Sequence, residues 1–197
     1  MGGGRKVRKL TIIMQKEILF ITGNNKKVEE VRAITGLNVT AKNLDILEIQ
    51  SLDVEEVAKA KARVAFELVG QPVIVDDTGM SIEALGGLPG ALIVWFLDSL
   101  GPEGILRLMA SEKNRKASVS TCIAYADETG VFAFTGKVLG TVSDSLRGET
   151  GFGYDPIFIP DGHDRTYAEM TADEKNEISM RKIALLKWKE FMEQKYA

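Results

Sequence analysis

The sequence predicts an α/β fold with a mixed, curved central sheet flanked by helices. Between residues 17 and 75, short apolar runs rich in β-branched residues alternate with amphipathic helical segments, a pattern typical of strands joined by helices. Residues 117–125 and 131–142 read as longer strands of partly alternating polarity around a turn, which is typical of an antiparallel pair. We expect this pair to form a second lobe, with a cleft between the two lobes.

The composition describes a globular chain without a strong charge bias. Hydrophobic residues make up 45% of its 197 residues and the formal net charge is −3, so we expect no stable nucleic-acid binding. A single cysteine, Cys122, excludes an internal disulfide and suits a reducing cytoplasm. Cys122 and the only histidine, His163, cannot build a structural zinc site, but carboxylates could still bind Mg²⁺. No apolar run is long enough to predict a membrane-spanning helix.

The N-terminal residues differ in composition from the rest of the chain. Residues 1–14 are basic and glycine-rich, and their apolar run at residues 10–14 is too short for a secretory signal. We therefore expect residues 1–14 to be a flexible N-terminal extension, either a cloning remnant or an upstream start. Residues 15–197 are expected to form a single two-lobed domain, since this length can bury one good core.

A candidate anion site follows the first predicted strand, residues 17–22. Residues 22–27, with the sequence Thr-Gly-Asn-Asn-Lys-Lys, lead into a helix that ends at Gly36. Free N–H groups at a helix N-terminus favour a phosphate, and the lysines add positive charge. From these residues alone, an ordinary asparagine N-cap with solvated lysines is an equally good interpretation.

The second predicted helix carries a lysine within its apolar face. After a short strand at residues 39–41 and a loop, Asp53 or Ser51 caps a helix that runs to about Val69. Lys61 lies on the apolar side of this helix. Burying a lysine is costly unless an anion meets it, but a lysine stem can also extend to water. The sequence does not decide between these two interpretations.

The segment after this helix is the most suggestive of a functional site. Residues 73–75 read as a buried strand that stops at two adjacent carboxylates, Asp76 and Asp77, followed by Thr78 and Gly79. Open α/β sheets bind ligands at the carboxyl ends of strands, and adjacent carboxylates there repel each other unless a cation intervenes. Taken alone, the same residues are also ordinary strand-ending turn residues.

The middle of the chain is expected to be helical. We expect a short helix at residues 81–85, then an apolar helix at residues 91–100 that contains Trp95 and Phe96. Pro102 lies near the start of a further helix that runs to about residue 110. These helices precede the antiparallel pair of strands.

The last predicted element is a single long helix. It begins at the capping box of residues 171–174 and continues close to the end of the chain. On one continuous helix, Lys175 and Arg181 lie about 120° apart. They could therefore flank one ligand without forming a single stripe.

Seven motifs, taken together, make the chain similar to the inosine triphosphate pyrophosphatase family. The resemblance covers residues 18–191. Each motif is weak alone, and their shared order makes the signal specific. They are Thr22-Gly-Asn-Asn-Lys-Lys27 with Glu30, Ala58-Lys-Ala-Lys61-Ala, Asp76-Asp77-Thr78-Gly79, Leu85-Gly-Gly-Leu-Pro-Gly90, Gly151-Phe-Gly-Tyr-Asp-Pro156, Tyr167-Ala-Glu-Met170 and Glu174-Lys-Asn-Glu-Ile-Ser179-x-Arg181.

This resemblance implies an activity. Members of the family hydrolyse ITP, dITP or XTP between the α- and β-phosphates, with magnesium, and release the nucleoside monophosphate and pyrophosphate. They thereby remove deaminated purines from the nucleotide pool. The implied partner is a small-molecule nucleoside triphosphate in a nucleotide cleft between the two lobes. The resemblance also suggests a cytoplasmic homodimer, for which Trp95 and Phe96 are candidate interface residues, although a core role fits them equally well.

The resemblance also implies roles for residues near the phosphates. Glu48 and Asp77 match the metal-binding residues, and Asp77 also matches the residue assigned to water activation. The catalytic residues implied in this way are Asp77, Lys27 and Lys61. Substrate contacts are implied for residues of the anion loop and its surroundings, namely Thr22, Gly23, Asn24, Asn25, Lys26, Lys27, Lys61 and Thr78.

A second group of residues matches the family's base-binding positions. These residues are Phe152, Gly153, Tyr154, Asp155, Lys175, Met180 and Arg181. An aromatic ring can stack on a purine while polar groups meet its edge. The sequence departs from the family at Met180, where the usual residue is histidine. Methionine offers no hydrogen-bond donor, so we expect catalysis with looser purine discrimination.

Two other functions fit part of the same pattern. A Maf-like pyrophosphatase would share the architecture but act on pyrimidine or modified nucleotides. A non-catalytic nucleotide-binding protein would retain a vestigial site. The base-binding motifs favour the first activity over the Maf-like one. The combination of Glu48, Lys61 and Asp77 argues against a protein that only binds, because such a protein does not need a water-activating carboxylate.

Overall fold

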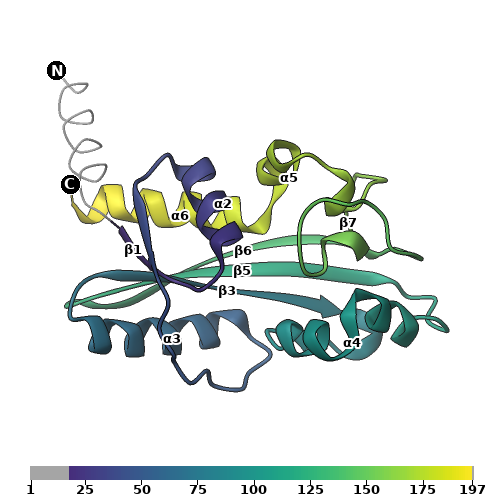
Figure 1. Ribbon diagram of the computed structural model, residues 1–197, viewed down its shortest axis with the longest axis horizontal. Helices are drawn as coiled ribbons and strands as arrows, with labels where there is room; N and C mark the ends of the chain where they lie inside the picture. The colour runs from purple at the N-terminus through teal and green to yellow at the C-terminus, as the bar shows by residue number, and fades with distance from the viewer. Residues whose placement is uncertain (1–17, 197) are drawn as a thin grey trace.

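The computed structural model describes residues 18–196. Within that part of the chain, five α-helices flank one open, mixed sheet of seven strands (Figure 1). The predicted α/β class with a mixed central sheet is therefore confirmed. The expected N-terminal extension, residues 1–14, lies outside the described residues. None of the helices that the structure describes has the length and apolar character needed to cross a membrane.

The elements follow one another with short connections. The strands are β1 (Ile18–Ile21), β2 (Val39–Lys42), β3 (Val73–Ile82), β4 (Pro89–Gly90), β5 (Lys116–Asp127), β6 (Gly130–Val142) and β7 (Phe158–Pro160). The α-helices are α2 (Asn25–Thr35), α3 (Val54–Val69), α4 (Ile93–Leu108), α5 (Ala172–Ile178) and α6 (Met180–Lys195). Three 3₁₀ turns are η1 (Glu83–Leu85), η2 (Asp155–Ile157) and η3 (Tyr167–Glu169).

The sheet has the order β2-β1-β3-β5-β6-β7, with the short β4 beside β3. β1 runs parallel to β2 and β3, whereas β3, β5, β6 and β7 are antiparallel neighbours. The expected antiparallel pair is confirmed as β5 and β6, which meet in register from Lys116↔Thr141 to Asp127↔Gly130. This pair continues the sheet that contains β1, and the division of the chain into two lobes stays a prediction.

β3 is longer than the sequence predicts. Its parallel pairing with β1 ends at Ile21↔Val75, but its antiparallel pairing with β5 continues to Ile82. The prediction that the strand stops at Asp76 is therefore wrong, because β5 supports the polar residues that follow as part of a ladder. The prediction of a helix at residues 81–85 is wrong in its first half for the same reason. The sheet thus loses β1 as a neighbour where the two carboxylates begin.

Helices cover both faces of this sheet. Figure 1 shows α3 and α4 on one face of the long strands, with α2, α5 and α6 on the other. The amphipathic helix expected after residue 53 is confirmed as α3, with Asp53 as its N-cap. The two helices expected on either side of Pro102 are confirmed as two segments of α4, which break at Gly101 with a φ of 68°. The predicted site residues therefore include members of the sheet and of helices on both of its faces.

The long C-terminal helix of the prediction is two helices. α5 ends at Ile178, Ser179 has extended backbone angles, and the Ser179 side chain caps α6 by accepting a hydrogen bond from the N–H of Lys182. The capping box at residues 171–174 is confirmed at the start of α5. Because the helix axis is interrupted, the predicted angle of 120° between Lys175 and Arg181 does not apply.

A glycine in β6 lets the start of α6 approach the sheet closely. A Cβ at Gly136 would collide with the carbonyl oxygen of Met180 and would lie 2.9 Å from the backbone nitrogen of Ala184. Only a residue without a side chain fits between β6 and this first turn. The close approach places Arg181, the second residue of α6, against the middle of the sheet.

Candidate active site

The site lies where β1 ends and the chain turns into α2. The hydroxyl of Thr22 accepts a hydrogen bond from the N–H of Asn24 at 3.1 Å. The side chain of Asn24 accepts hydrogen bonds from the N–H groups of Lys26 and Lys27 at 3.0 and 3.3 Å. The asparagine N-cap of the prediction is therefore confirmed, and the lysines after it have specific partners.

Asp76 lies on the face of β3 that meets α2 and α6. Its Oδ1 is 2.6 Å from Nζ of Lys27, and its Oδ2 is 3.0 Å from Nε of Arg181. Burial by itself raises the pKa of Asp76, but the charges of Lys27 and Arg181 outweigh burial and lower this pKa to about 2. Asp76 is therefore an ionised carboxylate held between two cations.

The ion pairs continue from Arg181 to Glu30 of α2 and on to Lys175 of α5. Glu30 pairs with Nη1 of Arg181 through one oxygen and lies 3.2 Å from Nζ of Lys175 through the other. Lys175 in turn lies 2.8 Å from Oδ2 of Asp155. Together with Lys27 and Asp76, these residues form a row of six alternating charges that we call the charge chain.

Asp77 points to the opposite face of the sheet from Asp76, as adjacent strand residues do. Its Oδ2 is buried and has no hydrogen-bond partner among the described residues. Burial raises the pKa of Asp77 to about 7, with further repulsion from Asp76 and Glu48 and opposing attraction from Lys27 and Lys61. The two neighbouring carboxylates therefore have opposite electrostatic surroundings.

Lys61 has the anionic partner that one interpretation of its sequence position required. Its ammonium group forms an ion pair with the carboxylate of Glu48. Glu48 belongs to the segment between β2 and α3, which contains no helix or strand. The charge of Lys61 on the inner side of α3 is therefore balanced by a residue of the neighbouring segment.

Most of the predicted site residues line one cavity, which we call the central pocket. The members that were predicted are Asn24, Lys27, Asp77, Thr78, Phe152, Gly153, Tyr154, Asp155, Lys175, Met180 and Arg181. The structure adds three apolar residues of α4, namely Ile93, Val94 and Leu97. The sequence predicted this helix but not its role as a wall. The sequence carries no signal for this role, because the three residues read as ordinary core positions of an apolar helix, and only the structure shows that Val94 is 58% exposed.

Six predicted residues lie around the central pocket without lining it. Thr22 and Asn25 flank the cap of α2, and Gly23 packs against Asn43, where a Cβ would lie 3.1 Å from the side-chain oxygen. Glu48 and Lys61 form their own pair, and Glu48 lines a separate hollow beside Trp95. The sixth is Lys26, whose Nζ donates a hydrogen bond to the carbonyl oxygen of Gly151 at 3.0 Å.

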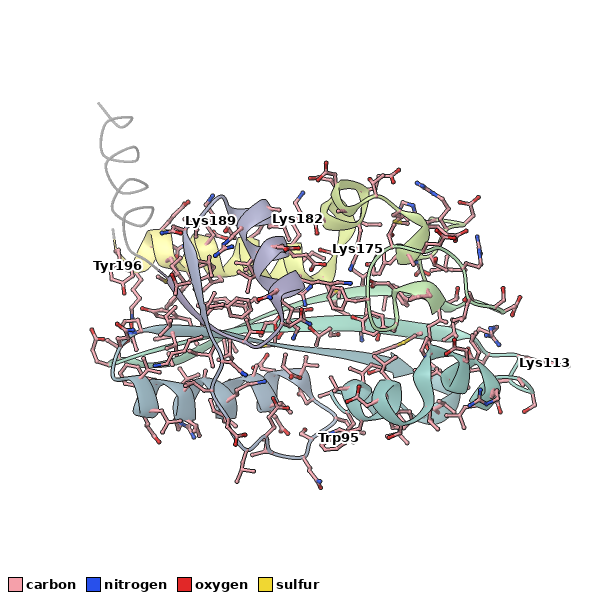
Figure 2. The ribbon with its side chains drawn as sticks, in the orientation of Figure 1. Trp95, Lys113, Lys175, Lys182, Lys189 and Tyr196 are labelled. Carbon is pink, nitrogen blue, oxygen red and sulfur yellow. The ribbon has the colours of Figure 1, made fainter. Side chains whose placement is uncertain are left out.

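The loop with Phe152 is held by groups from several elements. Oδ2 of Asp155 accepts a hydrogen bond from the N–H of Phe152 at 2.8 Å. Nζ of Lys175 lies 4.7 Å from the centre of the Phe152 ring, and Figure 2 shows Lys175 above the long strands, beside α2. Burial raises the pKa of Asp155, while Lys175 acts in the opposite direction. Asp155 thus orients the loop as well as facing the central pocket.

The residues next to the central pocket fit a hard cation. Asp77 presents a buried carboxylate oxygen that has no hydrogen-bond partner in the described part of the chain, and Glu48 is the nearby carboxylate whose charge affects it. Oxygen donors of this kind suit Mg²⁺, which commonly takes one or two carboxylates together with water and phosphate oxygens. No group of three or more histidine, cysteine, aspartate or glutamate side chains in residues 18–196 forms a closed metal cage.

Comparison with known structures defines the class of protein. The fold matches that of the Staphylococcus aureus Ham1 protein with a TM-score of 0.81 and 28% sequence identity, over 91% of this chain and 100% of that one. It matches a Coxiella burnetii HAM1 protein with a TM-score of 0.80 and 30% identity, over 90% and 98% of the two chains. These matches define the class of protein as one with a Ham1-type fold.

The sequence comparisons give the family. The sequence model of the Ham1 family matches residues 18–191, so the chain belongs to that family. A dITP/XTP pyrophosphatase of Methanopyrus kandleri is 45% identical over 179 residues, which cover 89% of this chain and 95% of the relative. An inosine triphosphate pyrophosphatase of Kluyveromyces lactis is 42% identical over 186 residues, with coverage of 89% and 95%. The resemblance found in the sequence motifs is confirmed.

The charge chain predicts that Asp76→Asn destabilises the fold strongly. Arg181 would keep its buried charge with Glu30 as its remaining carboxylate partner, and breaking a buried ion pair in this way costs about 3–5 kcal/mol. We expect that decrease in the free energy of unfolding, measured by urea denaturation. Lys59→Met is the control, since Lys59 pairs with Glu55 at the surface and such pairs contribute about 0.3–0.5 kcal/mol. Equal effects of the two substitutions would contradict the prediction.

Proposed function

We propose that this protein hydrolyses deaminated purine nucleoside triphosphates, ITP, dITP and XTP, to the nucleoside monophosphate and pyrophosphate. Family membership and relatives named as dITP/XTP and inosine triphosphate pyrophosphatases support this activity. The observation that carries it is that one pocket is lined both by Asp77, whose buried Oδ2 has no hydrogen-bond partner within residues 18–196, and by the capped N-terminus of α2. Asp77 can accept a proton from water, and the N-terminus of α2 can bind phosphate.

The triphosphate is proposed to lie along the start of α2. The cap residue Asn24 and Lys27 line the central pocket, and Lys61 adds positive charge from α3. Hydrolysis at the α-phosphorus builds negative charge on the phosphate oxygens, which fixed cations stabilise. We assign Lys27 and Lys61 to this stabilisation, and Oδ2 of Asp77 to accepting the proton of the attacking water.

Mg²⁺ is proposed to bind through Glu48 and Asp77. When bound, this cation would neutralise negative charge on the phosphate oxygens. Lys61 and Glu48 already form an ion pair. With Mg²⁺ bound to Glu48, Lys61 would lie beside the metal site, and its charge would no longer serve only to balance that of Glu48. The proposal requires both carboxylates to be ionised, and the charges of Lys27 and Lys61 favour ionisation of Asp77.

The purine is proposed to stack on Phe152, with its polar edge toward Asp155, Lys175 and Arg181. Arg181 is assigned as a donor to the 6-oxo group that distinguishes hypoxanthine and xanthine from adenine. Met180 is buried and lines the central pocket beside Arg181, so it contacts the base through a side chain without a hydrogen-bond donor. Val94 and Leu97 of α4 supply an apolar wall on this pocket.

The activity is tested with purified protein, Mg²⁺ and a panel of triphosphates that includes ITP, XTP, dITP, the common purine nucleotides and pyrimidine nucleotides. We expect monophosphate and pyrophosphate from the deaminated purines, at kcat/KM values well above those for ATP. Release of orthophosphate would overturn the assigned cleavage site. Turnover of pyrimidine nucleotides alone would support a Maf-like activity, and binding without turnover would support a nucleotide-binding protein.

Asp77→Asn is expected to lower kcat about 100-fold or more, because the variant cannot accept a proton. Binding of the product IMP, measured by calorimetry, is expected to change little. Asp161→Asn is the control, since Asp161 is an exposed carboxylate remote from the pocket residues. A titration of Mg²⁺ against the rate, with EDTA as the reference, tests the metal proposal in the same assay. Unimpaired turnover by Asp77→Asn would remove Asp77 from its catalytic role.

Met180→His is expected to raise the preference for ITP over GTP. The imidazole would restore a polar contact to the purine edge, and a site whose polar group is left unpaired by the wrong base rejects that base. The measurement is the ratio of the two kcat/KM values in the variant and in the unaltered protein. Equal ratios would show that residue 180 does not set base discrimination.

We also propose that the protein acts as a cytoplasmic homodimer. Trp95 is 71% exposed and lies near exposed Leu47, an apolar pair that a second copy could cover. Figure 2 shows Trp95 at the outer side of the α3–α4 layer. Phe96, the other candidate, packs partly against the core, which leaves Trp95 as the better interface residue. A monomer mass by light scattering would contradict the dimer.

A further inference from the structure

Lys26 makes contacts that a phosphate-binding residue does not need. Lys26 and Lys27 are consecutive in the first turn of α2, but successive residues of an α-helix differ in direction by about 100°. Lys27 faces Asp76 and lines the central pocket. Lys26 instead reaches 125 residues along the chain to the carbonyl oxygen of Gly151, at 3.0 Å. The two lysines therefore serve different parts of the site.

The ammonium group of Lys26 also lies near the Phe152 ring. Its Nζ is 5.6 Å from the ring centre, within the range in which a cation is attracted to an aromatic face. Lys175 of α5 approaches the same ring at 4.7 Å. Phe152 is thus contacted by cations from two helices, α2 and α5, neither of which belongs to its own loop.

A second cavity, which we call the outer hollow, shares Phe152 and Lys175 with the central pocket but is not lined by Asp77 or Thr78. It is lined by Lys26, Glu30 and Ala33 of α2 together with Thr150, Phe152 and Lys175, among other residues. Phe152 and Lys175 also line the central pocket, whereas Lys26 lines only the outer hollow. Phe152 therefore borders both cavities, and Lys26, which lines the outer hollow, contacts its loop.

The position of Lys26 is electrostatically unusual for a helix. The first turn of α2 contains no acidic residue and two lysines, although the positive end of the helix dipole disfavours cations. Lys27 is compensated by Asp76. The compensating contacts of Lys26 are the carbonyl of Gly151 and the ring of Phe152.

We propose that Lys26 is a positioning residue that holds the Phe152 loop against the central pocket, and that it does not bind the substrate phosphates. Its hydrogen bond to Gly151 fixes the backbone beside the ring, and its charge attracts the ring itself. Because Lys26 and Lys27 share one helical turn, the helix that binds phosphate also fixes the surface on which the base stacks. This proposal depends on the proposed function for the identity of the substrate.

The test compares Lys26→Met with Lys26→Arg, Lys27→Met and Lys59→Met. We expect Lys26→Met to raise the KM for ITP roughly three- to tenfold with a much smaller change in kcat, as expected for loss of one cation–π contact and one charged hydrogen bond. The inhibition constant of inorganic tripolyphosphate, which has no base, is expected to stay unchanged. Lys26→Arg is expected to restore the KM, because arginine retains the charge and the donors.

The controls separate positioning from phosphate binding. Lys27→Met is expected to weaken ITP and tripolyphosphate together, and Lys59→Met to change neither, since Lys59 pairs with Glu55 at the surface. In a Phe152→Ala background, Lys26→Met is expected to add no further increase in KM, because the ring that it positions is gone. This lack of additivity is a result that general destabilisation would not produce.

Two results would overturn the proposal. Equal weakening of ITP and tripolyphosphate by Lys26→Met would show that Lys26 binds phosphate directly. Additive effects of Lys26→Met and Phe152→Ala would show that Lys26 acts independently of the ring. Failure of the proposed function is a separate outcome, since the unaltered protein would then not hydrolyse ITP. In that case the comparison of affinities for IMP and tripolyphosphate tests Lys26 in the same way.

Discussion

The buried ion pair between Asp76 and Arg181 is the interaction on which the site depends. Two charges that are nearly inaccessible to water meet at 3.0 Å, and each needs the other because an isolated buried charge is very costly. Arg181 can reach Asp76 only because α6 begins against Gly136 of the sheet. Asp76 also holds Lys27 at the start of α2. One strand and two helices are therefore fixed relative to one another by a single carboxylate.

The same arrangement leaves Asp77 available for chemistry. The nearest cations on the α2 and α6 side are occupied by Asp76, and the alternation of the strand directs Asp77 to the face covered by α3. Lys61 on that face is paired with Glu48, and one oxygen of Asp77 has no hydrogen-bond partner among residues 18–196. Adjacent carboxylates thus divide into one that is held in ion pairs and one, Asp77, that we propose to be reactive.

Local patterns predicted α2 and α3 well, because their caps and stops are nearby residues. Asn24 and Gly36 define the ends of α2 within its own segment. The prediction failed where distant residues decide the structure. β3 continues through Asp76 because β5 pairs with it and Arg181, 105 residues away, neutralises it. Ser179 was read as the interior of a helix, although a serine that caps the following turn also ends the preceding helix.

The prediction of the site likewise succeeded where sequence motifs are sufficient and failed where the folded arrangement decides. Its motifs identified most lining residues through the family resemblance, because their shared order is specific although each motif alone is weak. The apolar wall from α4 was missed since Val94 and Leu97 resemble core residues in the sequence. Lys26 was grouped with the phosphate loop because sequence proximity does not show which way a helical side chain points. Only the folded chain shows its contact with Gly151.

The continuation of β3 beyond Val75 has a consequence for how the site behaves when it is empty. Asp76, Asp77 and Thr78 belong to a ladder in which β3 pairs with β5 along its whole length. Central strands are commonly the last parts of a protein to open, and their amides exchange with solvent slowly. Asp77, to which we assign the proton transfer, is therefore preorganised by the sheet, and its placement requires no rearrangement when a ligand arrives. Glu48 comes from a segment without helix or strand. Any loss of conformational freedom on ligand binding would therefore fall on the Glu48 segment and not on Asp77.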